Sequence, residues 1–488
     1  MCATLSMTET APVPTREADA DVIVLGVGTC GEDLSLRLLG AGLKVVGVEA
    51  ALVGGECAYW ACLPTKMMIR AASALQEARR VDGLAGKVTV TADWAPVAAR
   101  VRTEATGGWD DSVAVARFEG RGGRLVHGRG RLVGPATVAV GEERFTARRG
   151  VVIATGSKPA IPPIPGLEAV DYWTTHDVIE AETLPESLVV LGGGAVGCEL
   201  GQVLARFGVQ VTMVEAADRL LPGEEPEASA VVEEAFGAEG IAVHTGAAAQ
   251  EVSSRDGSMV ITLAGGAEVA GECLLVATGR AVDLGDLGLE AVGLDGAARF
   301  LTVDRRMRAG DGLWAMGDVT GKGLFTHVAL YQSAIVAADI LGEAHPPARY
   351  DAVPRATFTD PEVGAVGMTE SEARRAGRDV VVIVKQLPAT FRGWLHVSGS
   401  GLIKLVVERH SGVLLGATVV GPHGGEMLGL LSLAVHARVP LTELRSMIYA
   451  FPTFYGGIGE AVGAYGRGLA TVIDPAYDGF DLLDAVGS

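Results

Sequence analysis

The sequence predicts an α/β fold built on two Rossmann-like units, and three observations support this. An apolar, β-branched run at 21–26 ends in a glycine cluster and continues into a helical period. The same order of strand, glycine turn and helix returns at 188–216. Glycine, at 67 of 488 residues, concentrates in such clusters rather than in linkers. Glycine turns between a buried strand and a helix are typical of phosphate-binding loops.

The composition is that of a large, acidic, globular protein. Apolar residues make up 49% of the chain, and 59 Asp and Glu outnumber 40 Lys and Arg, which gives a formal net charge of −19. The length predicts about three or four domains, each able to bury a core without metal or disulfide staples. The negative charge argues against partners such as nucleic acid or anionic membrane, since both bind basic surfaces.

The hydropathy and the N-terminal segment predict a soluble, cytoplasmic protein. No apolar run approaches the roughly 18 residues that a membrane span needs. Residues 1–19 lack the charged-then-apolar layout of a signal peptide, and we expect them to be disordered.

The first Rossmann-like unit comprises a strand at 21–26, a helical stretch at 32–42 and a strand at 43–50. In such units one glycine permits a tight turn, a second lets pyrophosphate approach the backbone and a third allows close helix packing. A carboxylate at the end of the second strand accepts hydrogen bonds from a ribose. These residues are Gly26, Gly28, Gly31 and Glu49.

The second unit repeats the first with the same spacing, since its first glycine and acidic residue are as far apart (192 to 215) as in the first copy (26 to 49). The corresponding residues are Gly192, Gly194, Gly197 and Glu215. The repeat predicts two bound dinucleotides. Because a carboxylate repels a 2′-phosphate, Glu215 favours NAD(H) over NADP(H), although Arg219 nearby would weaken that preference.

Two of the six cysteines form a pair, Cys57 and Cys62, ahead of a helical stretch at 67–80. Two cysteines at this spacing can close a disulfide, and a helix N-terminus lowers the pKa of a thiol held there. Zinc would require further ligands at short spacing, and the nearest histidine in sequence is His127, so no metal is predicted. A purely structural disulfide remains the alternative to a redox-active pair.

The run GGECAYWACLPTK at 54–66 resembles the redox-disulfide motif of the class I pyridine nucleotide-disulfide oxidoreductases, the family of glutathione reductase, dihydrolipoamide dehydrogenase and mercuric reductase. Further signatures of that family follow in order. Two crossing turns are matched by Ala154-Thr155-Gly156 and Ala277-Thr278-Gly279-Arg280, and the second FAD motif by Gly317-Asp318.

The resemblance implies FAD as a cofactor and a family architecture of two Rossmann-like domains and a C-terminal α+β domain. The expected parts are a disordered segment at 1–19, an FAD-binding part at 20–150 that holds the disulfide, an NAD(P)-binding domain at 151–275, a return to the FAD domain at 276–352, and a dimerisation domain at 353–488. Family members are homodimers whose partner subunit completes the active site.

The resemblance also implies catalytic roles. Cys62 is the thiol beside the flavin, and Cys57 is the interchange thiol that attacks a small-molecule substrate. Lys66 corresponds to the lysine at flavin N5, and Glu199 to the glutamate that pairs with it in the nicotinamide pocket. For each, a plain structural role is the alternative.

Further residues are expected to bind the cofactors. Asp318 would accept hydrogen bonds from FAD, and a helix that begins near Thr326 and His327 would direct backbone N–H groups at the flavin. The other matched positions are Gly55, Ala154, Thr155, Gly156, Gly279, Arg280 and Gly317.

The sequence departs from the family pattern in the last domain. Thiol-disulfide members carry His-Pro-Thr there, followed by Glu, and the histidine protonates the leaving thiol. This chain has Phe451 at the histidine position and Gly456 at that of the glutamate, with Pro452-Thr453 setting the register. Tyr455 and Glu460 are substitute donors, with packing as the simpler role for both.

Several functions remain open. One is an NAD(P)H-dependent flavoprotein that reduces a small disulfide, quinone or other electrophile needing little proton assistance. A second is thioether cleavage resembling that of 2-ketopropyl-coenzyme M carboxylase, which also has Phe at this position. A third is mercuric reduction, disfavoured because no cysteine follows Cys273. A nucleotide-binding protein with vestigial chemistry is the fourth. Aromatic residues expected near the substrate are Tyr59, Trp60, Trp394 and Phe454.

Overall fold

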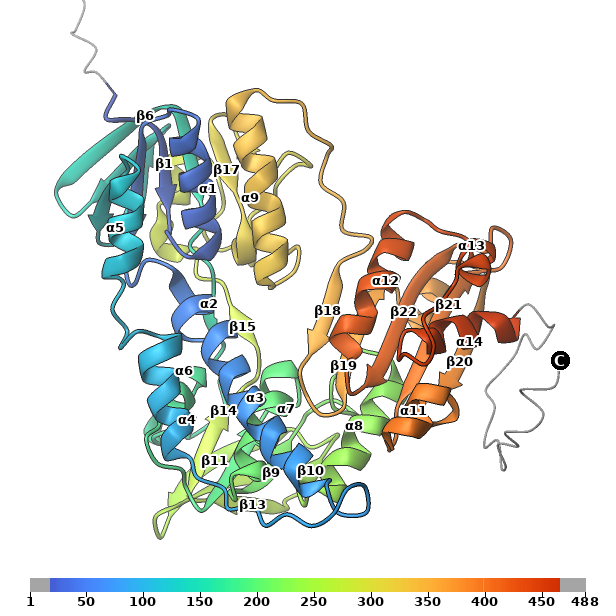
Figure 1. The fold of residues 1–488 in the computed structure, drawn as a ribbon. Helices are drawn as coiled ribbons and strands as arrows, with labels where there is room; N and C mark the ends of the chain where they lie inside the picture. The colour runs from blue at the N-terminus through green and yellow to red at the C-terminus, as the bar shows by residue number, and fades with distance from the viewer. Residues whose placement is uncertain (1–17, 398, 466–488) are drawn as a thin grey trace, which may run out of the picture.

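The computed structural model describes residues 18–397 and 399–465, which form three sheet-based parts (Figure 1). Of the segment expected to be disordered, 1–19, residues 1–17 lie outside the described residues. Residues 466–488 also lie outside them. Among the described residues no helix is long and apolar enough to cross a membrane.

The first part is an eight-stranded sheet whose main path runs β16-β17-β6-β1-β2-β3. Its strands are β1 (Ala20–Leu25), β2 (Val45–Glu49), β3 (Arg124–His127), β4 (Gly130–Gly134), β5 (Thr137–Val140), β6 (Glu143–Ile153), β16 (Arg308–Gly310) and β17 (Leu313–Ala315). Its helices are α1 (Thr29–Gly40), α5 (Ser112–Gly120) and α9 (Thr326–Leu341). Because β17 pairs in parallel with β6, the chain returns to this sheet after building the second part.

A helical segment extends from the first part toward the second, as Figure 1 shows in blue. It contains α2 (Gly55–Tyr59), α3 (Cys62–Arg79) and α4 (Ala95–Arg100). The predicted helix at 67–80 is confirmed and begins five residues earlier, at Cys62 itself.

The second part contains a parallel sheet of order β10-β9-β8-β14 and a three-stranded antiparallel sheet, β11-β12-β13. The strands are β8 (Ser187–Leu191), β9 (Gln210–Val214), β10 (Ala242–His244), β11 (Ala249–Arg255), β12 (Ser258–Leu263), β13 (Glu268–Gly271) and β14 (Cys273–Val276). Its helices are α6 (Thr175–Glu180), α7 (Ala195–Arg206) and α8 (Pro226–Ala238). The two crossing segments pair as a short antiparallel ribbon of β7 (Lys158–Pro159) and β15 (Arg280–Ala281).

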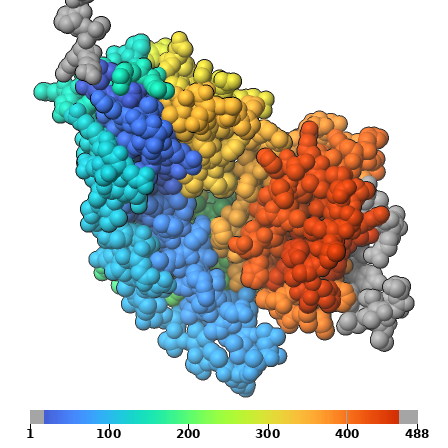
Figure 2. Space-filling model, turned by 45° about the horizontal axis from the view of Figure 1, so that its top comes forward, coloured from blue at the N-terminus to red at the C-terminus, as the bar shows by residue number. Residues whose placement is uncertain are grey.

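The third part is an antiparallel five-stranded sheet of order β18-β19-β22-β21-β20 with helices packed on it, which confirms the α+β prediction. The strands are β18 (Pro354–Thr357), β19 (Glu362–Gly367), β20 (Val380–Gln386), β21 (Leu402–Glu408) and β22 (Leu414–Gly421). The helices are α10 (Glu370–Arg375), α11 (Phe391–His396), α12 (Gly424–His436), α13 (Leu441–Ser446) and α14 (Gly456–Tyr465). In Figure 2 this orange-red part lies beside the blue N-terminal part, and the surface is hollowed between the two.

Two strands extend beyond the predicted part boundaries. Strand β6 of the first sheet continues to Ile153, past the expected boundary at 150. Strand β14 ends at Val276, past the expected boundary at 275. Both strands end directly before the crossing turns, because the chain changes sheet only after its last paired residue. The division into functional domains stays a prediction.

A buried ion cluster joins the second and third parts. The ammonium of Lys404, on β21, lies 3.0 Å from Glu225 and 2.8 Å from Glu227, which begin α8, and 3.1 Å from Glu370. The side chains of Lys404 and Glu225 are each 2% exposed. Lys404 supplies a positive charge that balances the buried Glu225 carboxylate, which also accepts a hydrogen bond from the backbone of Glu370 at 2.7 Å. The contact between these parts is therefore sensitive to the loss of that charge.

Replacing Lys404 with methionine is therefore expected to lower the free energy of unfolding by about 3 kcal/mol, because Glu225 is left buried and unpaired. Urea unfolding of the variant measures the change. Arg409→Met is the matched control, since Arg409 pairs with Asp379 at the surface and its loss is expected to cost less than about 1 kcal/mol. Equal losses in the two variants would contradict the expectation.

Candidate active site

The two Rossmann-like units hold their acidic residues in matching ways. Glu49 accepts hydrogen bonds from the backbone N–H groups of Val27 at 2.7 Å and Ala51 at 2.9 Å. Glu215 makes the same two contacts in the second unit, at 2.6 and 2.7 Å. Burial raises the pKa of the Glu49 carboxyl, against these backbone contacts, which lower it. Each carboxylate is thus tied to the glycine turn of its own unit.

The first glycine of each turn is required by a close backbone approach. Gly26 has a φ of +92°, and a Cβ there would lie 2.4 Å from the carbonyl oxygen of Ala154. Gly192 has a φ of +112°, and a Cβ there would lie 2.5 Å from the carbonyl oxygen of Ala277. Each crossing turn therefore closes over the first glycine of one unit.

The second glycine of each turn faces open space. A Cβ on Gly28, before α1, would meet no atom closer than 3.7 Å, and one on Gly194, before α7, none within 4 Å among the described residues. A cavity of about 250 Å³ opens beside Glu215 and Thr278. Open space before a helix N-terminus, with a carboxylate beside it, fits the pyrophosphate and ribose of a dinucleotide in each unit.

Gly194→Val tests the second of these units. The valine side chain would occupy the open space and is expected to raise KM for NADH at least tenfold, while the flavin absorbance spectrum stays unchanged. Steady-state kinetics measures KM. Gly223→Val is the control, because Gly223 is exposed in the same part and its Cβ would also meet no described atom within 4 Å. An unchanged KM in Gly194→Val would show that the nucleotide does not cross this turn.

The predicted cysteine pair lies where three helix ends meet. Cys57 is in α2, Cys62 is the first residue of α3, and Thr326 is the first residue of α9. The Thr326 hydroxyl donates a hydrogen bond to Cys57 Sγ at 3.2 Å and lies 3.3 Å from Cys62 Sγ. One residue from a distant segment thus contacts both sulfur atoms.

The surroundings make the two thiols unequal. The pKa of Cys62 is lowered to about 6, chiefly by a hydrogen bond from Cys57 and further by the Thr326 hydroxyl and the charge of Lys66, while burial opposes the shift. The pKa of Cys57 is raised by that same hydrogen bond and by burial. The surroundings therefore favour the thiolate at Cys62 and the protonated thiol at Cys57.

Lys66 and Glu199 form the ion pair that the resemblance implied. Their side chains, from α3 and α7, lie 2.7 Å apart, and that of Glu199 is only 6% exposed. Glu199 also accepts a hydrogen bond from the backbone of Phe358 at 2.8 Å, and the Lys66 ammonium lies 4.9 Å from the centre of the Phe358 ring. Sequence reasoning did not single out Phe358, which belongs to the third part and helps to fix this ion pair.

Asp318 is linked to both crossing turns. It accepts a hydrogen bond from the Ser157 hydroxyl, and Ser157 in turn accepts one from Arg280 at 2.7 Å. Asp318, Arg280 and Gly317 are thus brought together with the end of the Gly156 turn. The His327 ring has contacts of its own, since its Nε2 lies 2.9 Å from the Pro354 carbonyl oxygen and its ring stacks on Phe325. The cofactor-binding role of the backbone N–H groups at this helix start stays a prediction.

Sequence reasoning missed a polar contact next to the cysteines. Glu56, which precedes Cys57, lies 2.8 Å from Arg280 and 2.9 Å from Nε2 of His176. The His176 ring stacks on Trp60. Arg280 was part of a recognised motif, but His176 lies far away in the sequence in no such motif, and nothing in its local pattern marks it.

Phe451 does not approach the cysteine pair of its own chain. It is 73% exposed, packs edge-on against Phe391, and directly precedes the segment that leads into α14. Figure 1 shows α14 on the opposite side of the molecule from α2. A role for Phe451 beside a cysteine pair would therefore require a second chain. Ile448, 94% exposed nearby, adds to this apolar surface.

The two substitute proton donors have partners of their own. The Tyr455 hydroxyl accepts a hydrogen bond from the backbone of Ala450 at 2.9 Å. Glu460 lies 3.8 Å from Lys385, and burial raises the pKa of its carboxyl. These contacts fit the packing role for both residues.

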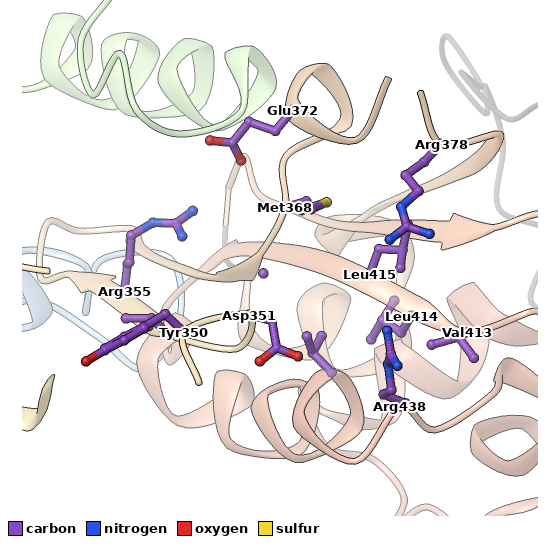
Figure 3. Close-up of a pocket in the computed structure, with 13 residues that line it drawn as sticks. Tyr350, Asp351, Arg355, Met368, Glu372, Arg378, Val413, Leu414, Leu415 and Arg438 are labelled. Atoms are coloured by element: carbon purple, nitrogen blue, oxygen red, sulfur yellow. The ribbon is translucent and has the colours of Figure 1, made fainter. Parts of the chain in front are cut away.

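A separate cavity of about 480 Å³ lies in the third part (Figure 3). Arg378 and Arg438 form one of its walls, Asp351 lies opposite, and Leu414 and Leu415 are apolar neighbours. Neither Cys57 nor Cys62 lines this cavity, so it is not where the thiols react. Among the described residues, no group of three or more His, Cys, Asp or Glu is placed to hold a metal ion.

Comparison with known families gives two matches that together span most of the chain. The profile described as pyridine nucleotide-disulphide oxidoreductase matches residues 20–338. The profile of that family's dimerisation domain matches residues 353–462.

Curated relatives and solved structures agree with these matches. The chain is 35% identical to dihydrolipoyl dehydrogenase of Thermus scotoductus, over 91% of this chain and 97% of that protein. It is 30% identical to mercuric reductase of Staphylococcus aureus, over 91% of this chain and 82% of that protein. LpdA from Mycobacterium tuberculosis has a similar structure, with a TM-score of 0.81, 28% identity, and 91% and 99% of the two chains covered. The HOCl-induced flavoprotein disulfide reductase RclA from Escherichia coli has a TM-score of 0.80, 26% identity and the same coverage.

Proposed function

Because this chain belongs to the class I pyridine nucleotide-disulfide oxidoreductase family, whose members use FAD and NAD(P)H, we propose that it passes an electron pair from NADH to the Cys57–Cys62 pair and on to a small disulfide or similar electrophile. FAD would supply the two-electron redox chemistry between the nicotinamide and the cysteines. The inequality of the two thiols is the observation that carries the proposal.

Lys66, Cys57 and Cys62 have separate roles in the proposed reaction. Lys66, held by Glu199, lies one helical turn from Cys62 on α3 and stabilises its thiolate. Cys57 then attacks a disulfide substrate, which forms a mixed disulfide and releases one thiol. Cys62 attacks Cys57, which restores the internal disulfide and releases the second thiol. Two electrons reach the substrate; the Cys57 thiol supplies one proton, and the solvent supplies the second.

Proton supply is where this site would differ from its relatives. The raised pKa of Cys57 means that the attacking group holds a proton at neutral pH, and Phe451 offers no base to remove it. We propose that the physiological substrate is a small disulfide or other electrophile whose reduction needs little proton assistance beyond the proton held on Cys57. A quinone, or a thioether as in 2-ketopropyl-coenzyme M carboxylase, is the alternative.

NADH is the proposed donor in preference to NADPH. Glu215 stands where a 2′-phosphate would lie, and its carboxylate repels such a group. Arg219, a nearby cation that would attract it, is engaged by Asp218 at 3.1 Å and by the Pro222 carbonyl oxygen at 2.9 Å. These contacts support the preference.

A homodimer in the cytoplasm is the proposed working form. The dimerisation-domain match and the exposed Phe451 segment support a second subunit that completes the site. A reducing compartment suits a cysteine pair that must be re-reduced in each cycle.

An anaerobic titration with NADH, followed by absorbance and run in parallel with NADPH, tests the proposal. A long-wavelength band, from the Cys62 thiolate beside oxidised flavin, is expected after one equivalent of NADH. Because a thiolate exists only above its pKa, the band of the reduced enzyme should persist at neutral pH and fade as the pH falls through about 6. Bleaching of the flavin without this band would overturn the proposal.

A further inference from the structure

Trp60, which lies between the two cysteines in sequence, stacks with two aromatic rings. The His176 ring stacks on one side, with centroids 4.4 Å apart and planes 12° apart. Trp109 stacks on it as well, with centroids 5.6 Å and planes 25° apart. Stacked rings at these distances contribute beyond the area they bury. The loop between Cys57 and Cys62 is thus anchored at its middle.

Trp109 combines this stack with a polar atom that lacks a partner among the described residues. Its buried indole Nε1 has no hydrogen-bond partner among the described residues, and its φ of +57° is unusual for a bulky residue. The Arg102 guanidinium lies 5.7 Å from the ring centre on an adjoining turn. The structure therefore tolerates an unpartnered indole Nε1 and an unusual backbone conformation at the residue that stacks on Trp60.

His176 contacts the same loop a second time, through Glu56. Its Nε2 lies 2.9 Å from one carboxylate oxygen of Glu56, while Arg280 lies 2.8 Å from the other. Burial acts to raise the pKa of Glu56, but the hydrogen bond from His176 and the charge of Arg280 outweigh it, and the pKa is lowered. Glu56 is therefore a charged carboxylate with both oxygens engaged.

These two contacts bracket the reactive thiol. Glu56 directly precedes Cys57, and Trp60 follows it by three residues. His176 therefore contacts the loop on both sides of Cys57 in sequence. The histidine itself is well placed, because it sits in the first turn of α6, where Thr174 and Asp177 form a capping box. The second part of the chain thereby holds the redox loop of the first.

We propose that His176 is a positioning residue for the Cys57–Cys62 pair, which holds the loop so that both sulfur atoms stay close together, within 3.2 and 3.3 Å of the Thr326 hydroxyl. A loop already shaped for closure loses less conformational freedom when the S–S bond forms, so oxidation to the disulfide is favoured and the dithiol is the stronger reductant. The inference rests on the proposed function only in that the pair must cycle. His176 acts through Trp60 and Glu56 rather than on the sulfur atoms.

The test measures the equilibrium between the purified holoenzyme and mixtures of reduced and oxidised dithiothreitol, with the two cysteines quantified by alkylation and mass spectrometry. His176→Ala is expected to shift the equilibrium constant about tenfold toward the dithiol, equivalent to about 30 mV for a two-electron couple. His176→Phe keeps a ring on Trp60, and His176→Gln keeps a donor for Glu56. Each should recover part of the shift.

His244→Ala is the matched control, because His244 is an exposed histidine of the same part, on β10. Flavin absorbance and the melting temperature show that each variant is folded. An equilibrium constant for His176→Ala equal to that of His244→Ala would overturn the inference, and so would a shift that neither Phe nor Gln reduces. The measurement uses no NADH, so a wild-type enzyme whose cysteines NADH fails to reduce would refute the proposed function without affecting this result.

Discussion

Replacing Cys57 with serine is expected to lower NADH-dependent reduction of a disulfide by a factor on the order of 10³ or more, because the attacking sulfur is removed. Cys62 then has no partner with which to form a disulfide. The serine hydroxyl can still donate a hydrogen bond to Cys62, and the Thr326 hydroxyl and Lys66 remain beside it, so its thiolate should persist. The purified variant is therefore expected to show the long-wavelength band without any reductant, measured by absorbance at neutral pH.

Two further variants control this experiment. Cys62→Ser should lose both turnover and the band, because it removes the thiolate itself. Cys198→Ser should keep both, since Cys198 is a buried thiol in α7 that donates a hydrogen bond to the Gly193 carbonyl oxygen. If Cys57→Ser retained turnover, electrons would be reaching the substrate without the cysteine pair, as in a quinone reductase.

The second large effect is a gain. Phe451→His combined with Gly456→Glu restores a proton donor and the carboxylate that orients it, which typically contribute about 10²- to 10⁴-fold. With Cys57 protonated at neutral pH, we expect kcat/KM for a small disulfide such as lipoamide to rise at least about tenfold. Steady-state kinetics with NADH measures it.

The gain should depend on the imidazole rather than on the loss of the phenyl ring. Phe451→Leu is the control, because it keeps an apolar side chain at this exposed position and should leave kcat/KM within about twofold. A double variant with no gain would mean that the substrate in use does not need a proton from this position. Equal gains in both variants would mean that the phenyl ring had merely obstructed access.

The sequence by itself determined the local features of this protein. A glycine turn after an apolar strand is specified within some twenty residues, so both Rossmann-like units, their acidic residues and the helix at the cysteine pair were predictable. The structure confirms the strands that end at Glu49 and before Glu215, and the start of α9 at Thr326. The α+β nature of the last part, and the contact between Lys66 and Glu199, came from the family resemblance.

Only the tertiary structure decided what surrounds the thiols. The Thr326 hydroxyl reaches Cys57 and Cys62 from a segment more than 260 residues away. His176 reaches Glu56 and Trp60 from the second part of the chain, and no periodicity or motif announces it. Such contacts depend on how separate sheets pack, and the pattern of a short segment carries no information about that packing. The sequence therefore identified the reactive sulfur atoms, whereas the packing of three parts decided their proton affinities and the loop that holds them.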